Sequence, residues 1–245
     1  MIKKKMKALA MAAATMCSVS MLTPALAVDA LVANDDITQD AGSWAQMVGE
    51  GSLGFINSKL SKGRVWIEGQ ARINDNWDHF YQGMVRTAVG YSLSDRATIW
   101  AGYTWLPTQN LGKHYVNQQD VWPAFRYVLP TDIGTFSFRT MIESNFIQGS
   151  DVRFRPRQMI RFMHPMEFEP RLSLIAWDEF FIRVNSTKVG GQSGVDQNRA
   201  FAGLGWTFNK NFRAEAGYMN QYLDDATHTN NTMRHLIMGS VFINF

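Results

Sequence analysis

Cysteine is almost absent from this 245-residue chain, and the one example, Cys17, lies near the N-terminus. The chain beyond it can therefore form no disulfide bond. Long apolar runs are also scarce. The run from Ala8 to about Leu22 is too short, and begins too early, for a membrane-spanning helix. A mean hydropathy of −0.19 is unusual for a helical membrane protein, but it suits strands in which every second residue is apolar.

The N-terminus has the pattern of a secretory signal peptide. A basic start is followed by a short apolar stretch and then by Ala25-Leu26-Ala27, an A-x-A cleavage site. We therefore expect cleavage after Ala27, so that residues 1–27 form the signal peptide. Residues 28–42 are polar and acidic and are expected to form a flexible leader, with the folded domain at 43–245.

Lysine is scarce once the signal peptide is removed. The net charge of +3 includes Lys3, Lys4, Lys5 and Lys7, and without them the chain has 20 basic and 21 acidic residues. The basic pI of the whole chain therefore gives no reason to expect a nucleic-acid partner. Of the 20 basic residues 15 are arginine, whose planar guanidinium suits partly buried ion pairs better than the lysine ammonium does.

Period-two alternation of apolar and polar residues dominates the rest of the chain. It predicts strands at 43–57, 63–73, 80–93, 96–106, 119–129, 134–147, 151–164, 170–184, 196–208, 211–224 and 233–245. Tight turns alternate with longer polar connections at 107–118, 185–195 and 224–232, which is the pattern of an all-β antiparallel transmembrane β-barrel. Bacterial barrels usually have an even number of strands. We therefore predict 12, with one supplied by the leader, or 10 if one segment is not a strand.

The last predicted strand resembles the C-terminal strand of Gram-negative outer-membrane barrels. Its Ile237, Val241, Ile243 and Phe245 share one face, and the assembly machinery of that membrane reads such a strand as a signal. This resemblance implies a location in the cell outer membrane. The expected partners are the lipids of that membrane and, during biogenesis, the assembly machinery and periplasmic chaperones. We expect the barrel to be a monomer.

Alternation also predicts which charged residues face the lumen. The inward rows hold Glu68 with Arg72, Arg86, Arg126, Arg139 with Glu143, Arg153, Arg155, Arg157, Arg161, Glu179 with Arg183, Arg199, and Arg213 with Glu215. One interpretation is a ladder of ion pairs that fills a small barrel and fixes its register. The other is a narrow polar channel that prefers anions, lined by the arginines of 153–161.

Three residues do not fit this simple scheme. Alternation places the charge of Asp178 on the lipid-facing side, where it is unfavourable unless a bulge or the membrane interface accommodates it. Pro123 and Pro156 each lack an N–H group for the strand ladder, so both positions suggest bulges.

No set of residues predicts a reaction, a cofactor or a metal site, so we expect no enzyme. Among the five histidines, only His235 is placed as a lipid hydrolase in an outer-membrane barrel would need it, and Ser240 lies on the opposite face of that strand. Two alternatives nevertheless stay open. One is a lipid-modifying enzyme, and the other is a surface binding or adhesion module that uses the connections at 107–118 and 185–195.

Several stretches between about Trp44 and the C-terminus resemble a known family. They are 64–72 (RVWIEGQAR), 89–91 with 101–103 (VGY and AGY), 139–143 (RTMIE), 177–181 (WDEFF), 196–203 (DQNRAFAG) and 216–221 (AGYMNQ). The family consists of outer-membrane proteins catalogued as domain of unknown function 2490. The resemblance implies an outer-membrane barrel, and it brings neither an activity nor functional residues.

Overall fold

The computed structural model describes residues 37–245, except for 110–114, 190, 226 and 228–229, and the predicted signal peptide therefore lies outside the described residues. The described chain is almost entirely β-structure. Its strands are β1 (Thr38–Ser52), β2 (Gly63–Asn74), β3 (His79–Ser92), β4 (Ala97–Gln109), β5 (Tyr115–Thr131), β6 (Gly134–Ile147), β7 (Arg153–Met166), β8 (Glu169–Arg183), β9 (Gly194–Asn209), β10 (Phe212–Leu223) and β11 (Thr232–Asn244). Over the same residues, no helix has the length and apolar character needed to cross a membrane.

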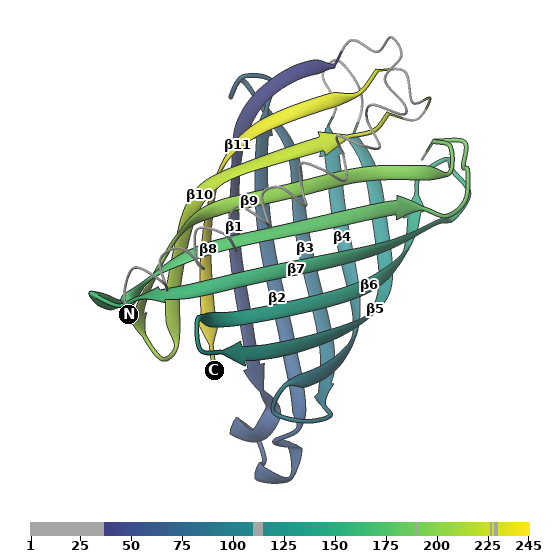
Figure 1. The fold of residues 1–245 in the computed structure, drawn as a ribbon. Coiled ribbons are helices and arrows are strands. Elements are labelled where there is room, and N and C mark those ends of the chain that lie inside the picture. The colour runs from purple at the N-terminus through teal and green to yellow at the C-terminus, as the bar shows by residue number, and fades with distance from the viewer. Residues whose placement is uncertain (1–36, 110–114, 190, 226, 228–229) are drawn as a thin grey trace.

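The strands form a closed barrel in which each strand pairs with its neighbours in sequence and β1 pairs with β11 (Figure 1). Sequential pairs are antiparallel, whereas β1 and β11 run parallel, from Thr38 opposite Thr232 to Glu50 opposite Asn244. An odd number of alternating strands leaves the first and last pointing the same way, so closure requires this parallel pair.

The predicted strand number of 12, and the alternative of 10, are therefore wrong. Each of the eleven predicted segments corresponds to one of the eleven strands, and the closed order has no place for another. β1 begins at Thr38, so residues 38–42 of the predicted leader are part of the barrel wall. The expectation of an even number failed because it assumed antiparallel closure.

Side-chain and backbone contacts hold the β1–β11 seam together. At one end Arg234 Nε lies 3.0 Å from Asp40 Oδ2. At the other end the Phe245 N–H donates to the Glu50 carbonyl (3.1 Å). A Cβ atom at Gly51 would lie 2.3 Å from Phe245 Cδ2, so only glycine allows the terminal residue to approach so closely.

The barrel has two distinct ends, which we call the turn end and the loop end. The connections from odd to even strands and the C-terminus lie at the turn end. The connections from even to odd strands and the start of β1 lie at the loop end. The β1–β2 connection at the turn end contains two short 3-10 turns, η1 (Leu53–Phe55) and η2 (Ser58–Leu60). The connection predicted at 107–118 is shorter than expected, because β4 and β5 extend into it as far as Gln109 and Tyr115.

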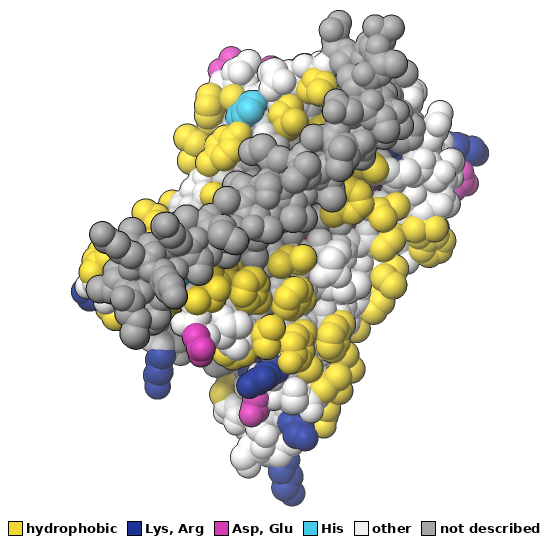
Figure 2. Space-filling view, in the orientation of Figure 1, with side chains coloured by type: hydrophobic (Ala, Val, Ile, Leu, Met, Phe, Trp, Pro, Cys, Tyr) yellow, Lys and Arg dark blue, Asp and Glu magenta, His cyan; other side chains and the backbone are white. Residues whose placement is uncertain are grey.

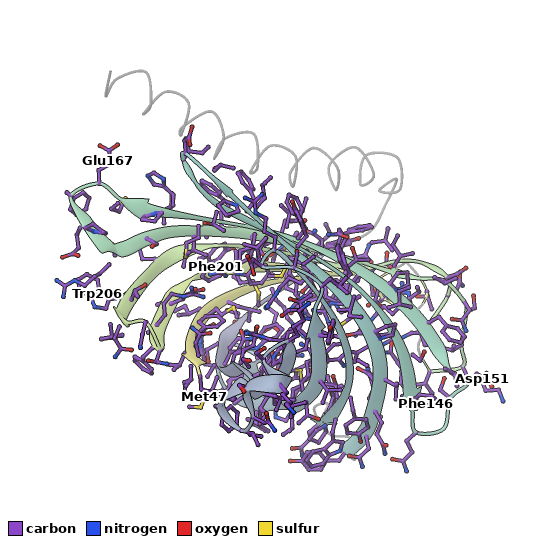
Figure 3. All side chains as sticks on the ribbon, turned by 90° about the horizontal axis from the view of Figure 1, so that it is seen from below. Met47, Phe146, Asp151, Glu167, Phe201 and Trp206 are labelled. Carbon is purple, nitrogen blue, oxygen red and sulfur yellow. The ribbon has the colours of Figure 1, made fainter. Side chains whose placement is uncertain are left out.

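Side chains alternate between an exposed outer face and a buried inner face. In β11, Ile237 is 63% exposed, whereas its neighbours Leu236 and Met238 are 4% and 6% exposed. Figure 2 shows hydrophobic side chains spread over the strands, with charged side chains gathered toward the ends. Seen from below in Figure 3, side chains crowd the space that the strands enclose. The core of this protein is thus the filled interior of the barrel.

Two buried apolar clusters lie on the inner face. One joins β1 to β8–β11 and includes Trp44, Trp177 and Phe201. The other joins β1–β6 and is built on Trp66, Trp100 and Trp122. The Trp66 ring meets the rings of Trp100 and Trp122 edge to face, with centroids 5.6 and 5.8 Å away. Tryptophan supplies the volume that a narrow barrel interior needs to be filled.

The bulges suggested by single residues are not found. Pro156 pairs with Ile142 in unbroken register, and the β5–β6 ladder keeps one register on both sides of Pro123. Asp178 keeps its outward position and accepts two hydrogen bonds from the Asn198 side chain (3.1 Å each). An amide on the neighbouring strand therefore satisfies the outward carboxylate without a bulge.

Candidate functional site

The charged residues predicted for the lumen all lie on the inner face of the wall. Fourteen line one of two internal cavities: Glu68, Arg72, Arg86, Arg126, Arg139, Glu143, Arg153, Arg155, Arg157, Arg161, Glu179, Arg199, Arg213 and Glu215. Arg183 is also buried and pairs with Asp224, which lines the same interior (2.5 Å). The alternation of apolar and polar residues along the strands was therefore sufficient to assign these residues to the inner face.

Five of these residues form what we call the central belt: Glu68, Arg86, Glu143, Arg157 and Glu179. Arg157 Nη1 lies 2.7 Å from Glu143 Oε1, and Arg157 Nη2 lies 2.6 Å from Glu179 Oε2. Arg86 lies 3.2 Å from Glu68 and 3.9 Å from Glu143. The three glutamates are at most 2% exposed, so the belt is a line of paired charges buried in the lumen.

Strand register brings the belt together. Glu143 on β6 lies opposite Arg155 on β7, and Glu179 on β8 lies opposite Met159 on β7. Arg157 lies between these positions on β7, diagonal to both glutamates, and diagonal neighbours are within reach of a long side chain. The Phe181 ring packs below Arg157, with 4.3 Å between its centroid and Cζ, which further fixes the guanidinium.

Most of the partners predicted along single strands are wrong. Glu68 does not pair with Arg72, Arg139 does not pair with Glu143, and Glu179 does not pair with Arg183. Residues four positions apart in a strand are separated by roughly 13 Å, whereas residues facing each other on adjacent strands are about 5 Å apart. Arg213 and Glu215 are two positions apart and do pair, with 2.9 Å between Nε and Oε1.

Sequence reasoning missed several carboxylates of the lumen. Glu50 receives two hydrogen bonds from Arg126, both of 2.6 Å, and one from Arg64 (2.8 Å). Asp120 is 1% exposed and accepts a hydrogen bond from Gln118 (2.8 Å). Glu50 and the inward Trp44 are six positions apart in β1 and therefore lie on the same face. The alternation of β1 could thus have predicted that Glu50 faces the lumen. The missed acids also include Asp40, Asp196 and Asp224, which lie near the ends of strands.

A cavity of about 380 Å³ occupies the turn end of the lumen, and we call it the turn-side vestibule. The arginines that line only this vestibule have close carboxylate partners. Arg161 lies 2.5 Å from Glu215, and Arg139 lies 2.9 Å from Glu179. Together with the Glu50 and Glu215 pairs described above, these contacts neutralise most of the charge at this end.

A second cavity, of about 320 Å³, occupies the loop end, and we call it the loop-side vestibule. Its acid Asp196 lies near three arginines, at 2.9 Å from Arg155, 3.6 Å from Arg183 and 3.8 Å from Arg153. Trp44, Arg86, Arg157 and Arg199 line both vestibules. The central belt therefore lies where the two cavities adjoin.

Three arginines of the loop-side lining have amide partners instead of close carboxylates. Arg153 donates through Nε to Asn145 (2.9 Å), and its carboxylate partner, Asp196, is 3.8 Å away. Arg72 donates to the side-chain oxygens of Gln70 and Gln82. Arg199 donates through Nε to Gln197 (3.1 Å), and its nearest carboxylate, that of Glu179, is 3.9 Å away. The guanidiniums of Arg72 and Arg199 also lie against the Trp44 ring, with Cζ 3.7 and 4.8 Å from its centroid.

The histidines do not form a cluster in the described part of the chain. His79 contacts the Gln109 carbonyl, and His164 contacts the Ile133 carbonyl. His114 and His228 lie outside the described residues. Within the described ranges, no group of three or more histidine, cysteine, aspartate or glutamate side chains is arranged to hold a metal ion.

His235 lies on the outer face, between the Tyr218 hydroxyl (2.5 Å from Nδ1) and the Gln39 side-chain oxygen (2.9 Å from Nε2). Ser240 is 6% exposed on the inner face, where its hydroxyl donates to Gln46 (3.3 Å). The barrel wall separates this histidine from that serine, as the alternation predicted.

Comparisons with known proteins agree with the family resemblance. A family model described as a protein of unknown function, DUF2490, matches residues 41–233. An uncharacterised protein of Methylorubrum extorquens is 30% identical over 192 residues, which cover 76% of this chain and 84% of that protein. No solved structure matches the chain. The extent of the family match and the similarity of this relative show that the chain belongs to the DUF2490 family of proteins of unknown function.

Proposed function

We propose that this protein is an outer-membrane β-barrel whose lumen is sealed by the central belt, so that it acts as a closed, membrane-anchored barrel. The observation that carries the proposal is the contrast between the two faces of one wall. The outer face is apolar and exposed, and the inner face holds buried, paired charges. An apolar outer face needs lipid, and a paired belt resists the passage of water and ions.

The outer face and the strand lengths both suit a bilayer. Exposed outward residues include Ile67, Val85, Val89, Ile99, Tyr103, Trp105, Val121, Phe125, Ile142, Phe146 and Ile160. Exposed apolar surface of this extent is rare in water-soluble monomers. The shortest strands have 12 residues, and at the usual rise and tilt they span about 30 Å, close to the thickness of the hydrocarbon core.

The two termini support export and insertion. The basic start, the apolar stretch and Ala25-Leu26-Ala27 fit a signal peptide that directs the chain out of the cytoplasm. The outward row of Ile237 and Ile243 on β11, with Phe245 directly after it, fits the strand that the outer-membrane assembly machinery binds. We infer that the turn end, which holds the C-terminus, faces the periplasm and that the loop end faces the outside of the cell.

The energetics of the belt favour a closed lumen. To open a path, Arg157 has to leave Glu143, Glu179 or both, and breaking a buried pair costs about 3–5 kcal/mol. A state of that free energy is populated at roughly 1% or less. A closed barrel is therefore the resting form that we propose, and any conduction needs a rearrangement of the belt.

A narrow channel with a preference for anions is the second candidate. Among the described residues, seven arginines and four carboxylates line each vestibule, so an ion that crossed the opened belt would meet excess positive charge. The Arg157→Glu variant tests this candidate, because it reverses the charge where the two cavities adjoin. A channel predicts current that shifts toward cations in this variant.

Membrane insertion is tested by fractionating cells that express the full chain. We expect the protein in the outer-membrane fraction, resistant to extraction with carbonate, and with a gel mobility in detergent that changes on heating. Removal of Phe245 should lower the folded fraction in cells, because the closing strand then lacks its terminal aromatic residue. Recovery of the protein from the soluble periplasmic fraction would overturn the proposal.

A further inference from the structure

We propose that the loop-side vestibule is a binding site for a small multivalent oxyanion of the phosphate type, held by Arg72 and Arg199 beside Trp44. The inference goes beyond the proposed function, because it concerns the interior of the barrel and requires neither conduction nor insertion. It starts from a difference in pairing among buried arginines that line the same lumen.

The guanidinium of Arg72 has no carboxylate within 4.0 Å among the described residues. Its hydrogen bonds go to the amide oxygens of Gln70 and Gln82, with a longer contact to the Met84 sulfur (3.8 Å). An amide oxygen satisfies a donor but does not neutralise a full positive charge. Arg72 thus carries uncompensated charge on the wall of a cavity that an anion can occupy.

The guanidinium of Arg199 is almost as poorly neutralised, although the residue is only 8% exposed. Its nearest carboxylate, that of Glu179, is 3.9 Å away and already receives Arg157 at 2.6 Å and Arg139 at 2.9 Å. One carboxylate cannot neutralise three guanidiniums. Arg199 therefore has capacity for a further anionic partner.

The guanidiniums of Arg72 and Arg199 both lie against the ring of Trp44. Arg72 Cζ lies 3.7 Å and Arg199 Cζ 4.8 Å from the centroid of its ring, and the indole N–H is occupied by Gln70 (2.7 Å). A guanidinium that stacks on an aromatic ring keeps its N–H groups in the plane, at its edge. Arg199 uses Nε for Gln197, so its Nη groups are available to the oxygens of a ligand beside the ring, whereas the N–H groups of Arg72 face amide oxygens that an anion would have to share or replace.

The size and charge of the cavity indicate the class of ligand. A volume of about 320 Å³ accommodates a small ligand with ordered water, and it is near the lower limit for small-molecule sites. Its described lining residues include seven arginines against four carboxylates. Arginine forks match the geometry of phosphate and carboxylate oxygens, and two guanidiniums against one ring favour an ion with several oxygens and more than one charge.

The test is calorimetric titration of inorganic phosphate into the purified protein, refolded in detergent and confirmed as folded by its heat-dependent gel mobility. We expect saturable binding at one site that sodium chloride of equal ionic strength does not abolish. Arg72→Gln and Arg199→Gln should each weaken binding by about tenfold or more. The phosphate affinity of Arg72→Lys should lie between those of the wild type and Arg72→Gln, because lysine keeps the charge and lacks the forked guanidinium.

Arg213→Gln is the matched control, because it removes one guanidinium from the turn-side vestibule, where Glu215 still pairs with Arg161. It should change phosphate affinity by less than about twofold. The proposal is overturned if wild-type protein shows no saturable binding, or if the control weakens binding as much as the loop-side variants do. Because the titration uses protein in detergent, failure here is distinct from failure of membrane insertion or closure.

Discussion

The two vestibules have the same numbers of charged residues and differ in how these residues are paired. In the part of the chain that the structure describes, each is lined by seven arginines and four carboxylates. At the turn end, Arg126, Arg139, Arg161 and Arg213 each lie within 3.0 Å of a carboxylate oxygen. Of the arginines that line only the loop-side vestibule, Arg155 and Arg234 also have a carboxylate within 3.0 Å, but that of Arg153 is 3.8 Å away and Arg72 has amide partners. Arg199, which lines both vestibules, has its nearest carboxylate at 3.9 Å.

This difference indicates that the two ends of the lumen have different roles, one in stabilising the barrel wall and one in binding a ligand. Buried charges that are fully paired fix strand positions, and removing one partner leaves the other unsatisfied. Arginines without close carboxylates do little to hold the wall, but they leave donors for a ligand. Composition alone does not distinguish the two ends, whereas the pairing does.

The largest effect is expected at the boundary between the vestibules. Arg157→Gln leaves the buried Glu143 and Glu179 without their shared cation, so we expect the free energy of unfolding to fall by about 3–5 kcal/mol. Urea titration followed by tryptophan fluorescence measures it. Arg171→Gln is the control, because Arg171 is exposed at the turn end, where it pairs with Glu169 and lies over the Trp206 ring, and we expect a much smaller loss than for Arg157→Gln. Equal losses in both variants would contradict a structural role for the belt.

A smaller effect is expected in the turn-side vestibule. Glu50→Gln removes the carboxylate that holds Arg64 and Arg126, and the loss of charged hydrogen bonds should lower the free energy of unfolding by about 1.5–3 kcal/mol. Glu167→Gln, in the exposed β7–β8 turn at the same end (Figure 3), is the matched control and should have almost no effect. A loss for Glu50→Gln no larger than that of the control would show that pairing at this end is not structural.

The smallest effect is expected in the loop-side vestibule. Arg72→Gln leaves no carboxylate unpaired, so in buffer without phosphate the free energy of unfolding should change by less than about 1 kcal/mol. Added phosphate should then stabilise the wild type and not the variant, since a ligand stabilises only the state that binds it. A loss as large as that of Glu50→Gln would remove the difference between the two vestibules.

Strand positions were predictable because alternation is a local property of the sequence. All eleven segments appear as strands, and the outward row of β11 is as expected. The parallel closure was not predictable. Pairing of Thr38 with Thr232 joins the two ends of the domain and leaves no local pattern in either strand.

The sequence predicted which charged residues face the lumen, but it did not predict which of them form ion pairs. Parity placed Arg157 and Glu143 inside, but their contact depends on the register between β6 and β7. Register also determines the ion pairs of the central belt and the pairing of Glu50 with Arg126. It likewise determines that Arg72 meets amide oxygens instead of a carboxylate. A single sequence contains no direct record of register across strands.

Planar-bilayer recording with purified, refolded wild-type protein tests the central claim most directly. If the central belt seals the lumen, the inserted protein gives no steady conductance steps at low voltage, whereas Arg157→Gln gives steps because Glu143 and Glu179 lose the cation between them. Stable steps of uniform size from the wild-type protein, unchanged by Arg157→Gln, would contradict the account.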